Sequence, residues 1–432
     1  MTKINTAALS GMQELLPEEQ SIFNDLKFKL SEVYRQHGFL NIETPVIERS
    51  EILLAKAGGD TEKQIYKIIK TAETAKESNQ ALRFDHTVPL ARYVVEHQND
   101  LAFPFAVTQI GRNYRGERAQ KGRFREFYQC DVDIIAREHL DISSDAKIIA
   151  VIYAGLQTFD LPAMKIRINN RKLVNAFMQN LGLEKLTTTI SAIIDHAEKV
   201  SHEQTINALK ELGISADKVA KIDQFIHTHG NFQSIFSSLQ NILGDLSLLE
   251  EGLNELRTLS DILDLQGLAD AYEVDFMIVR GLDYYTGTVF EVCLNDYREI
   301  GSISGGGRYE NLCSNFSERR FPGVGGSIGL TRLFYVLRQK QFIDATQLPK
   351  PIDYCILPIS CAEFQSAFHL AEQLRVKHFT VDVDLSSKKL GDKIKHAAKL
   401  SDHAIIVGES EAKNQKFQVK DLRSGEVKSL EI

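Results

Sequence analysis

The sequence predicts an α+β protein: an antiparallel sheet core flanked by helices, a helical insertion, and a C-terminal α/β domain with a mostly parallel sheet. Three observations lead to this fold class. Two strand-like runs, residues 105–110 and 127–135, flank a polar, arginine-rich stretch and so indicate a long antiparallel hairpin. Between about residues 186 and 267, strand signals vanish and helical periodicity dominates. After residue 351, strand and helix patterns alternate strictly.

The first expected element is a helix that begins near Pro17 and ends before Gly38. Two glutamates occupy its first turn, where the helix dipole favours negative charge. The loosely alternating run 39–47 contains Pro45, which indicates a distorted strand or an edge strand. After these come the hairpin, a helix at 145–156 and a short strand at 165–168.

A polar stretch at 338–351, with two prolines near its end, fits a linker. Before it we expect strands at 273–279 and 289–294, a glycine-rich turn at Ser304–Gly307, and an apolar helix at 330–337. The sequence thus predicts a first domain at 1–337, interrupted by the helical insertion 186–267, and a second domain at 352–432. In the second domain we expect strands at 354–359, 380–385, 404–407, 417–421 and 427–432, with helices at 362–376 and 388–400.

Composition narrows the class of protein. Of 432 residues, 43% are hydrophobic and 25% are charged, which excludes a disordered or fibrous chain. No run of about 18 apolar residues and no signal-peptide pattern occurs, so we expect a soluble, cytoplasmic protein with no membrane partner. The five cysteines form neither an even framework nor a CxxC pair, and no protein side chain is assigned to a metal.

The net charge of −7 argues against a protein that binds nucleic acid over its whole surface. Charge is nevertheless uneven along the chain. The segment 112–125 carries six basic residues and one acid, and arginine forks suit phosphate oxygens. Nearby aromatic residues could stack on a base, although a solvated hairpin explains the charges equally well. Lys388, Lys395 and Lys399 share one face of a predicted helix, which is either a solvated face or a surface for a nucleic-acid backbone.

Other polar residues are spaced as a binding site would require. Gln129, Asp131 and Asp133 alternate along a predicted strand and therefore point to one face of the sheet. Tyr284 and Tyr285, in RGLDYYTGTVFEV, would more often be ordinary core aromatics. The GGGRYENL segment does not match the spacing of a Walker or dinucleotide-binding loop.

Taken in order, several segments resemble the motifs of one family, the class II aminoacyl-tRNA synthetases. FLNIETPVIE is similar to the first class motif, YRGERAQKGRFREFYQ to the second, and GVGGSIGLTRL to the third. RGLDYYTGTVFEV and GGGRYENL resemble the two signature segments of the histidine-specific members. The resemblance covers essentially the whole chain, and the C-terminal segment resembles the family's anticodon-binding domain. It implies a class II synthetase-like antiparallel sheet.

The resemblance also implies an activity. A member of this family ligates L-histidine to tRNA(His) through a histidyl-adenylate, with ATP and Mg²⁺, and works as a homodimer. The main alternative is a catalytically silent paralogue that serves as the regulatory subunit of ATP phosphoribosyltransferase in histidine biosynthesis. A class II synthetase for another amino acid is the second alternative, against which the two signature segments argue.

The matching positions imply a role for each site residue. Arg280 and Arg115 would be catalytic, with Arg280 on the carboxylate of histidine and the α-phosphate. The expected ATP-binding residues are Arg115, Glu117, Arg123, Phe127 and Arg332. The expected histidine-binding residues are Asp85, Thr87, Gln129, Asp133, Arg280, Tyr284 and Tyr285, and the expected contacts to the tRNA acceptor end are Arg118 and Gln120.

Two positions depart from the family pattern. Thr331 precedes Arg332 where the family commonly has an acid, and His86 stands between Asp85 and Thr87 where a small or apolar residue is usual. Neither departure removes a group that the resemblance assigns to chemistry.

Overall fold

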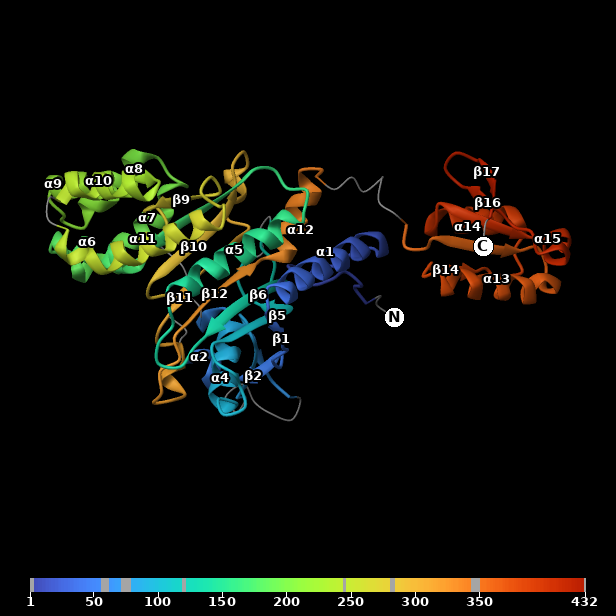
Figure 1. Cartoon of the computed structure of the whole chain (residues 1–432), viewed down its shortest axis with the longest axis horizontal. Coiled ribbons are helices and arrows are strands. Elements are labelled where there is room, and N and C mark those ends of the chain that lie inside the picture. The colour runs from blue at the N-terminus through green and yellow to red at the C-terminus, as the bar shows by residue number, and fades with distance from the viewer. Residues whose placement is uncertain are drawn as a thin grey trace. The chain divides into compact units, whose positions relative to one another are not determined.

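The computed structural model describes residues 4–55, 62–70, 79–118, 122–243, 246–279, 284–342 and 350–430. Packing divides the chain into two compact units (Figure 1). One comprises residues 1–13 and 26–342, and the other comprises residues 14–25 and 343–432. Among the helices in the described ranges, we find no candidate for a membrane span.

The first unit is built on a nine-stranded sheet. Its strand order is β1-β5-β6-β12-β11-β10-β7-β9-β8, and every neighbouring pair is antiparallel except β1–β5 and β7–β9. The strands are β1 (Leu40–Asn41), β5 (Phe105–Tyr114), β6 (Glu126–Ile135), β7 (Met164–Asn170), β8 (His229–Gly230), β9 (Tyr272–Asp275), β10 (Thr288–Leu294), β11 (Ser304–Tyr309) and β12 (Gly323–Ile328). The predicted hairpin is therefore confirmed as β5 and β6, and the expected edge strand is β1.

The glycine-rich segment 304–307 is part of a strand, so the predicted turn is wrong. It lies in β11, which pairs with β10 on one side and β12 on the other. A Cβ atom at Gly306 would lie 2.2 Å from the carbonyl oxygen of Gly325 and 2.7 Å from the ring of Phe290. Glycine is used here because the strands and a ring approach too closely for any side chain.

Helices cover one face of this sheet. Outside the insertion, the first unit contains the part of α1 (Pro17–Gln36) from residue 26 onward, together with α2 (Ser50–Leu54), α4 (Thr87–Glu96), α5 (Ser143–Gln157), α6 (Arg171–Asn180) and α12 (Leu330–Gln339). Helix α5 packs against β6, β10, β11 and β12, and α12 packs against β6. The inward-facing residues of β6 on this side, Cys130, Val132 and Ile134, are buried. A small antiparallel sheet, β2 (Ile47–Arg49), β4 (Gln80–Leu82) and β3 (Lys67–Ile68), lies beside α2.

The predicted helical segment contains α7 (Thr187–Ala197), α8 (His202–Glu211), α9 (Ala216–Ile226), α10 (Phe232–Leu243) and α11 (Glu250–Leu265), together with the short strand β8. Stacked rings attach it to the rest of the unit. Phe225 of α9 stacks on Phe177 of α6 with centroids 3.9 Å apart, and on Phe276, which follows β9, at 4.4 Å.

The second unit contains the expected α/β domain. Its sheet has the order β14-β13-β15-β16-β17, with β13 parallel to both β14 and β15 and an antiparallel pair at one edge. Its elements are β13 (Tyr354–Pro358), α13 (Phe364–Val376), β14 (Val381–Val383), α14 (Leu390–Leu400), β15 (His403–Val407), α15 (Glu409–Asn414), β16 (Gln418–Asp421) and β17 (Val427–Ser429). The α+β class with a C-terminal α/β domain is therefore confirmed.

Candidate active site

The site lies on the face of the large sheet opposite α5 and α12. Strand β6 supplies its floor, because Gln129, Asp131 and Asp133 point away from the buried residues that alternate with them. The predicted alternation of faces is confirmed. Strand β12 contributes the neighbouring part of the floor, with Gly325 opposite Asp133 and Ser327 opposite Asp131.

Two adjoining cavities occupy this face. The larger, of about 320 Å³, is lined by Arg115, Glu117, Gly122, Arg123, Phe124, Phe127, Tyr128, Gln129, Ser302, Ile303, Ser304, Gly305, Ser327, Gly329 and Arg332. The smaller, of about 30 Å³, is lined by Asp85, Thr87, Arg115, Gln129, Asp131, Asp133, Tyr284, Tyr285, Tyr309, Gly325, Gly326 and Ser327. Arg115, Gln129 and Ser327 belong to both linings, so the cavities share a wall.

All five residues expected to bind ATP line the larger cavity. The guanidinium of Arg115 lies over the ring of Phe127, 5.0 Å from its centroid, and Arg115 Nε donates to the carbonyl of Phe84 at 3.2 Å. Glu117 and Arg123 form an ion pair of 3.6 Å. Burial lowers the pKa of Arg332, and the positive charge of Arg123 lowers it further. Two cations held close together in a half-buried cavity favour an anionic ligand.

Thr331, the first departure from the family pattern, has a structural role. Its Oγ1 accepts a hydrogen bond of 2.7 Å from the backbone N–H of Tyr128. The ladder between β6 and β12 ends at Cys130 and Ile328, so this bond continues the attachment beyond the last paired residues.

Six of the residues expected to bind histidine line the smaller cavity. Asp85 is buried, its Oδ1 accepts from the backbone N–H of Val88 at 3.0 Å, and its Oδ2 has no hydrogen-bond partner among the described residues. Burial raises the pKa of Asp85 to about 6, partly offset by the bond from Val88. A buried carboxylate oxygen without a partner suits a cationic donor such as an ammonium group.

Asp133 lies deeper in the same cavity. Tyr309 donates a hydrogen bond of 2.8 Å to Asp133 Oδ1, and burial raises the pKa of Asp133 well above its ordinary range. Burial likewise raises the pKa of Tyr285. These carboxyl and phenol groups are buried away from bulk water. Together they provide a hydrogen-bond acceptor and a hydrogen-bond donor for a planar ring with two nitrogens.

Glycines on β11 and β12 make room for these groups. A Cβ atom at Gly325 would lie 1.9 Å from Asp133 Oδ1, and one at Gly323 would lie 2.3 Å from the ring of Tyr309. At Gly307, a Cβ would come within 3.0 Å of the ring of Tyr285. The glycine-rich strands therefore leave the volume that the polar groups of the cavity fill.

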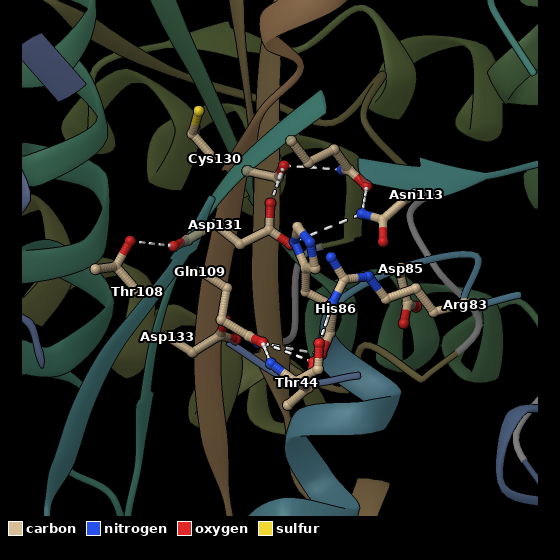
Figure 2. A network of polar contacts seen from close by, with 12 residues as sticks. Thr44, Arg83, Asp85, His86, Thr108, Gln109, Asn113, Cys130, Asp131 and Asp133 are labelled. Carbon is tan, nitrogen blue, oxygen red and sulfur yellow. Dashed lines mark hydrogen bonds and ion pairs between the residues drawn. The ribbon is translucent and has the colours of Figure 1, made fainter. Parts of the chain in front are cut away.

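Three of the polar side chains that line the smaller cavity had no role assigned from the sequence. The sequence analysis placed Asp131 on one strand face with Gln129 and Asp133 but gave it no role, and the structure brings it into this lining. Ser327 and Tyr309 lie within segments quoted as motifs, but neither was singled out, because only the pairing of β6, β12 and β11 brings them to this cavity. A chain of hydrogen bonds links Asp131 and Ser327 to Gln129, part of the polar network in Figure 2.

Three predicted residues remain. Arg280 and Gln120 lie outside the described residues. Arg118 is exposed and belongs to neither lining.

One group of potential metal ligands occurs in the described ranges, on the helical insertion. Asp223 lies 2.9 Å from His202 Nε2 and 3.3 Å from His227 Nδ1. His227 Nδ1 also lies 2.8 Å from the carbonyl oxygen of Asp223, the same contact that His37 makes with Val33 at the end of α1. Capping of the helix end therefore explains the position of His227, and we assign no metal there.

Two family models match the chain. "Histidyl-tRNA synthetase" matches residues 11–333, and "Anticodon binding domain" matches residues 353–432. A curated relative from Finegoldia magna, named histidine–tRNA ligase, is 40% identical over 431 residues, which cover 99% of this chain and 98% of the relative. A relative of the same name from Clostridium tetani is also 40% identical over 431 residues, covering 99% of this chain and 97% of that protein.

Solved structures agree with this assignment. The chain is similar to a crystal structure of histidyl-tRNA synthetase from Nostoc sp., with a TM-score of 0.87, 34% identity, and coverage of 99% of this chain and 97% of that one. A structure from Bacillus halodurans described as an ATP phosphoribosyltransferase regulatory subunit/histidyl-tRNA synthetase has a TM-score of 0.77 at 24% identity, with coverage of 94% and 99%, and shows the fold alone. The family matches span both units, the relatives are similar over nearly the full length, and the expected class II fold is confirmed. The chain therefore belongs to the histidyl-tRNA synthetase family.

Proposed function

We propose that this chain ligates L-histidine to its cognate tRNA in two steps. First, a carboxylate oxygen of histidine bonds to the α-phosphorus of ATP and the bond to pyrophosphate breaks, giving histidyl-adenylate. A hydroxyl of the terminal ribose of the tRNA then bonds to the carbonyl carbon, and AMP leaves. The observation that carries the proposal is the shared wall of the two cavities, which would bring an amino acid and a nucleotide together.

In the smaller cavity, we assign the α-amino group of histidine to Asp85, Thr87 and Gln129. The imidazole is assigned to Asp133 and Tyr285, with Tyr284 beside them. The hydroxyl of Tyr309 donates a hydrogen bond to Asp133 and holds it in place. A site built from such buried polar groups rejects an amino acid that leaves them unpaired by about 10⁴-fold or more, so no editing domain is required.

In the larger cavity, we assign the α- and γ-phosphates to Arg115 and Arg332. Glu117 and Arg123 would bind the nucleotide, with adenine on Phe127. Negative charge grows at the α-phosphate during the first step, and a fixed guanidinium stabilises that charge more in the transition state than in the ground state. Arg280 is assigned to the same phosphate from the sequence motif alone.

Mg²⁺ is expected to enter with ATP. Glu117 is the one carboxylate among the described residues that line the larger cavity, and Arg123 already pairs with it. Mg²⁺ commonly keeps several waters and relies on phosphate oxygens, so the phosphates would supply most of its ligands. Its chemical contribution when bound is to neutralise the pyrophosphate that leaves.

An exchange assay with each of the twenty amino acids tests the proposed function. We expect incorporation of labelled pyrophosphate into ATP with L-histidine and background rates with the other nineteen. Exchange with a different amino acid would contradict the assigned specificity. Silence with all twenty would instead support the regulatory-subunit alternative.

The second unit is proposed to approach the anticodon of the tRNA. Lys388, Lys395 and Lys399 are exposed, although α14 begins at Leu390 and Lys388 therefore precedes it. Lys393, on the same helix, is buried, and its Nζ donates to the carbonyl of Pro358 at 2.8 Å. At the acceptor end, Arg118 and Gln120 are proposed to contact the tRNA.

Replacing Lys388, Lys395 and Lys399 together by Gln in the full chain tests this surface. We expect KM for tRNA to rise about tenfold and its dependence on salt to weaken, because fewer counter-ions are released on binding. Pyrophosphate exchange should not change, since it requires no tRNA. Unchanged KM for tRNA would remove this surface from tRNA binding.

We also propose that the chain is a cytoplasmic homodimer. The segment similar to the first class motif exposes Leu40 and Ile47 in the single chain, with 61% and 49% of their surfaces accessible. A second copy that covered this segment would remove these side chains from water.

A further inference from the structure

His86, the second departure from the family pattern, is completely buried and belongs to neither cavity lining. Its Nδ1 lies 3.0 Å from Asp131 Oδ2, while its Nε2 has no hydrogen-bond partner among the described residues. A Cβ atom at Gly111 would lie 3.2 Å from His86 Nε2 and 2.6 Å from Arg83 Nη2, so the glycine leaves space for both groups. Figure 2 shows the ring between Asp131 and Arg83. With no acceptor for a proton on Nε2, the ring carries its proton on Nδ1 and donates it to Asp131.

The backbone of His86 is also fixed. Gln109 Nε2 donates to the carbonyl oxygen of His86 at 3.3 Å, and Gln109 Oε1 accepts from the hydroxyl of Thr44 at 2.8 Å. The backbone of Asp131 is fixed as well, because the hydroxyl of Thr108 donates to its carbonyl oxygen at 2.8 Å. The backbone at both His86 and Asp131 is therefore fixed by side chains of β5.

From Asp131, the hydrogen bonds continue into the cavity. The hydroxyl of Ser327 donates to Asp131 Oδ1 at 2.5 Å, and Gln129 Nε2 donates to Ser327 Oγ at 2.8 Å. Asn113 Nδ2 donates to Gln129 Oε1 at 2.7 Å. Asn113 Nδ2 lies 3.5 Å from His86 Nδ1, which is too long for a strong bond.

The direction of each bond depends on the one before it. His86 donates a hydrogen bond to one oxygen of Asp131, and the hydroxyl of Ser327 donates a hydrogen bond to the other. Ser327 then has only lone pairs left for Gln129, which must present its NH₂ group to Ser327. The carbonyl oxygen of Gln129 consequently faces the other way, with a lone pair left for a cationic donor.

We propose that His86 is a positioning residue for histidine binding: through Asp131 and Ser327 it fixes which way the carboxamide of Gln129 points. The inference rests on the proposed function, in which Gln129 accepts a hydrogen bond from the α-amino group. If residue 86 offered no donor, Asp131 Oδ2 would lose the hydrogen bond that holds it, and the carboxylate could rotate away from Ser327. Ser327 would then be free to donate to Gln129, and the carboxamide could turn over.

His86→Leu and His86→Asn test the proposal as a matched pair. Leucine fills the space without a donor, whereas the amide of asparagine can donate from a position close to Nδ1. We expect KM for histidine to rise about tenfold or more in His86→Leu, with KM for ATP within twofold of wild type, and to return towards wild type in His86→Asn. A purely structural role would lower the folded fraction or kcat and leave both KM values unchanged.

A double-mutant cycle with Ser327→Ala tests whether the effect of His86 on histidine binding depends on Ser327. If His86 acts through Ser327, His86→Leu should add little to KM for histidine once Ser327 is alanine. Additive effects, or an unchanged KM for histidine in folded His86→Leu protein, would overturn the proposal. If His86→Leu fails to fold, the cycle is run with His86→Gln, whose donor is displaced from Nδ1, and additive effects there would overturn the proposal in the same way. Wild-type protein without histidine-dependent exchange would instead overturn the proposed function, so the two failures are distinguishable.

Discussion

Arg115→Ala is expected to reduce histidine-dependent pyrophosphate exchange by about 10²–10³-fold. The side chain lies in the wall shared by the two cavities, where the carboxylate of one substrate would meet the α-phosphate of the other. Among the described residues, its side chain donates a hydrogen bond to the carbonyl of Phe84 and lies over the ring of Phe127, so the loss should fall on the transition state rather than on stability. The measurement is kcat/KM for exchange, alongside the melting temperature.

Arg112→Ala is the matched control. Arg112 lies on the same hairpin, pairs with Glu126 at 3.1 Å, and lines neither cavity. We expect exchange close to wild type in this variant. Equal losses in Arg112→Ala and Arg115→Ala would show that charge on the hairpin matters in general, and would remove Arg115 from its specific role at the α-phosphate.

Asp85→Asn should lower kcat/KM for histidine by about 10²-fold or more, because the amino group loses the charge of its acceptor. Asparagine keeps the oxygen that accepts from the N–H of Val88, so the start of α4 should remain intact. The pKa of Asp85 is about 6 in the folded protein, and the carboxyl becomes neutral below that pH. The ratio of kcat/KM between wild type and variant should therefore fall about tenfold for each pH unit below 6. The ratio also cancels the titration of the histidine substrate itself.

The same substitution should stabilise the empty protein at neutral pH. The pKa of Asp85 rises from its ordinary 3.8 to about 6 on folding, so the folded state binds the proton more tightly than the unfolded state. Wild-type stability should therefore fall as pH rises from about 4 to 6, by up to about 3 kcal/mol. Asp85→Asn lacks this dependence and should be the more stable protein at pH 7.5, with the difference vanishing below pH 4. A variant less stable than wild type at pH 7.5 would contradict the burial of this charge.

The sequence predicted the framework of this site well. Alternation along residues 129–133 placed three polar side chains on one face, and this needed only the period of a strand. The ordered motifs named five of the residues that line the larger cavity, although Arg115 and Arg332 are more than two hundred positions apart. The resemblance to the family indicated that these distant residues share one site. Local sequence patterns carry no such information.

The glycine-rich segment 304–307 shows where reasoning from local sequence failed. Glycine has two uses, conformational freedom in a turn and the absence of a side chain in a crowded strand, and the sequence alone favoured the first. The second applies here, because β10 and β12 lie on either side and Cβ atoms would collide with them. Local sequence does not state which strands will be neighbours.

The sequence by itself determined the fold class, the family, and most of the residues expected to bind substrates, because each follows from periodicity or from an ordered set of motifs. Only the tertiary structure decided the roles of Ser327, Tyr309 and His86. These side chains act through partners on other strands, and hydrogen-bond direction and burial depend on distances across the sheet. His86 illustrates the difference. In the sequence it is only a departure from the family pattern, whereas in the structure it begins a series of hydrogen bonds that ends in the smaller cavity.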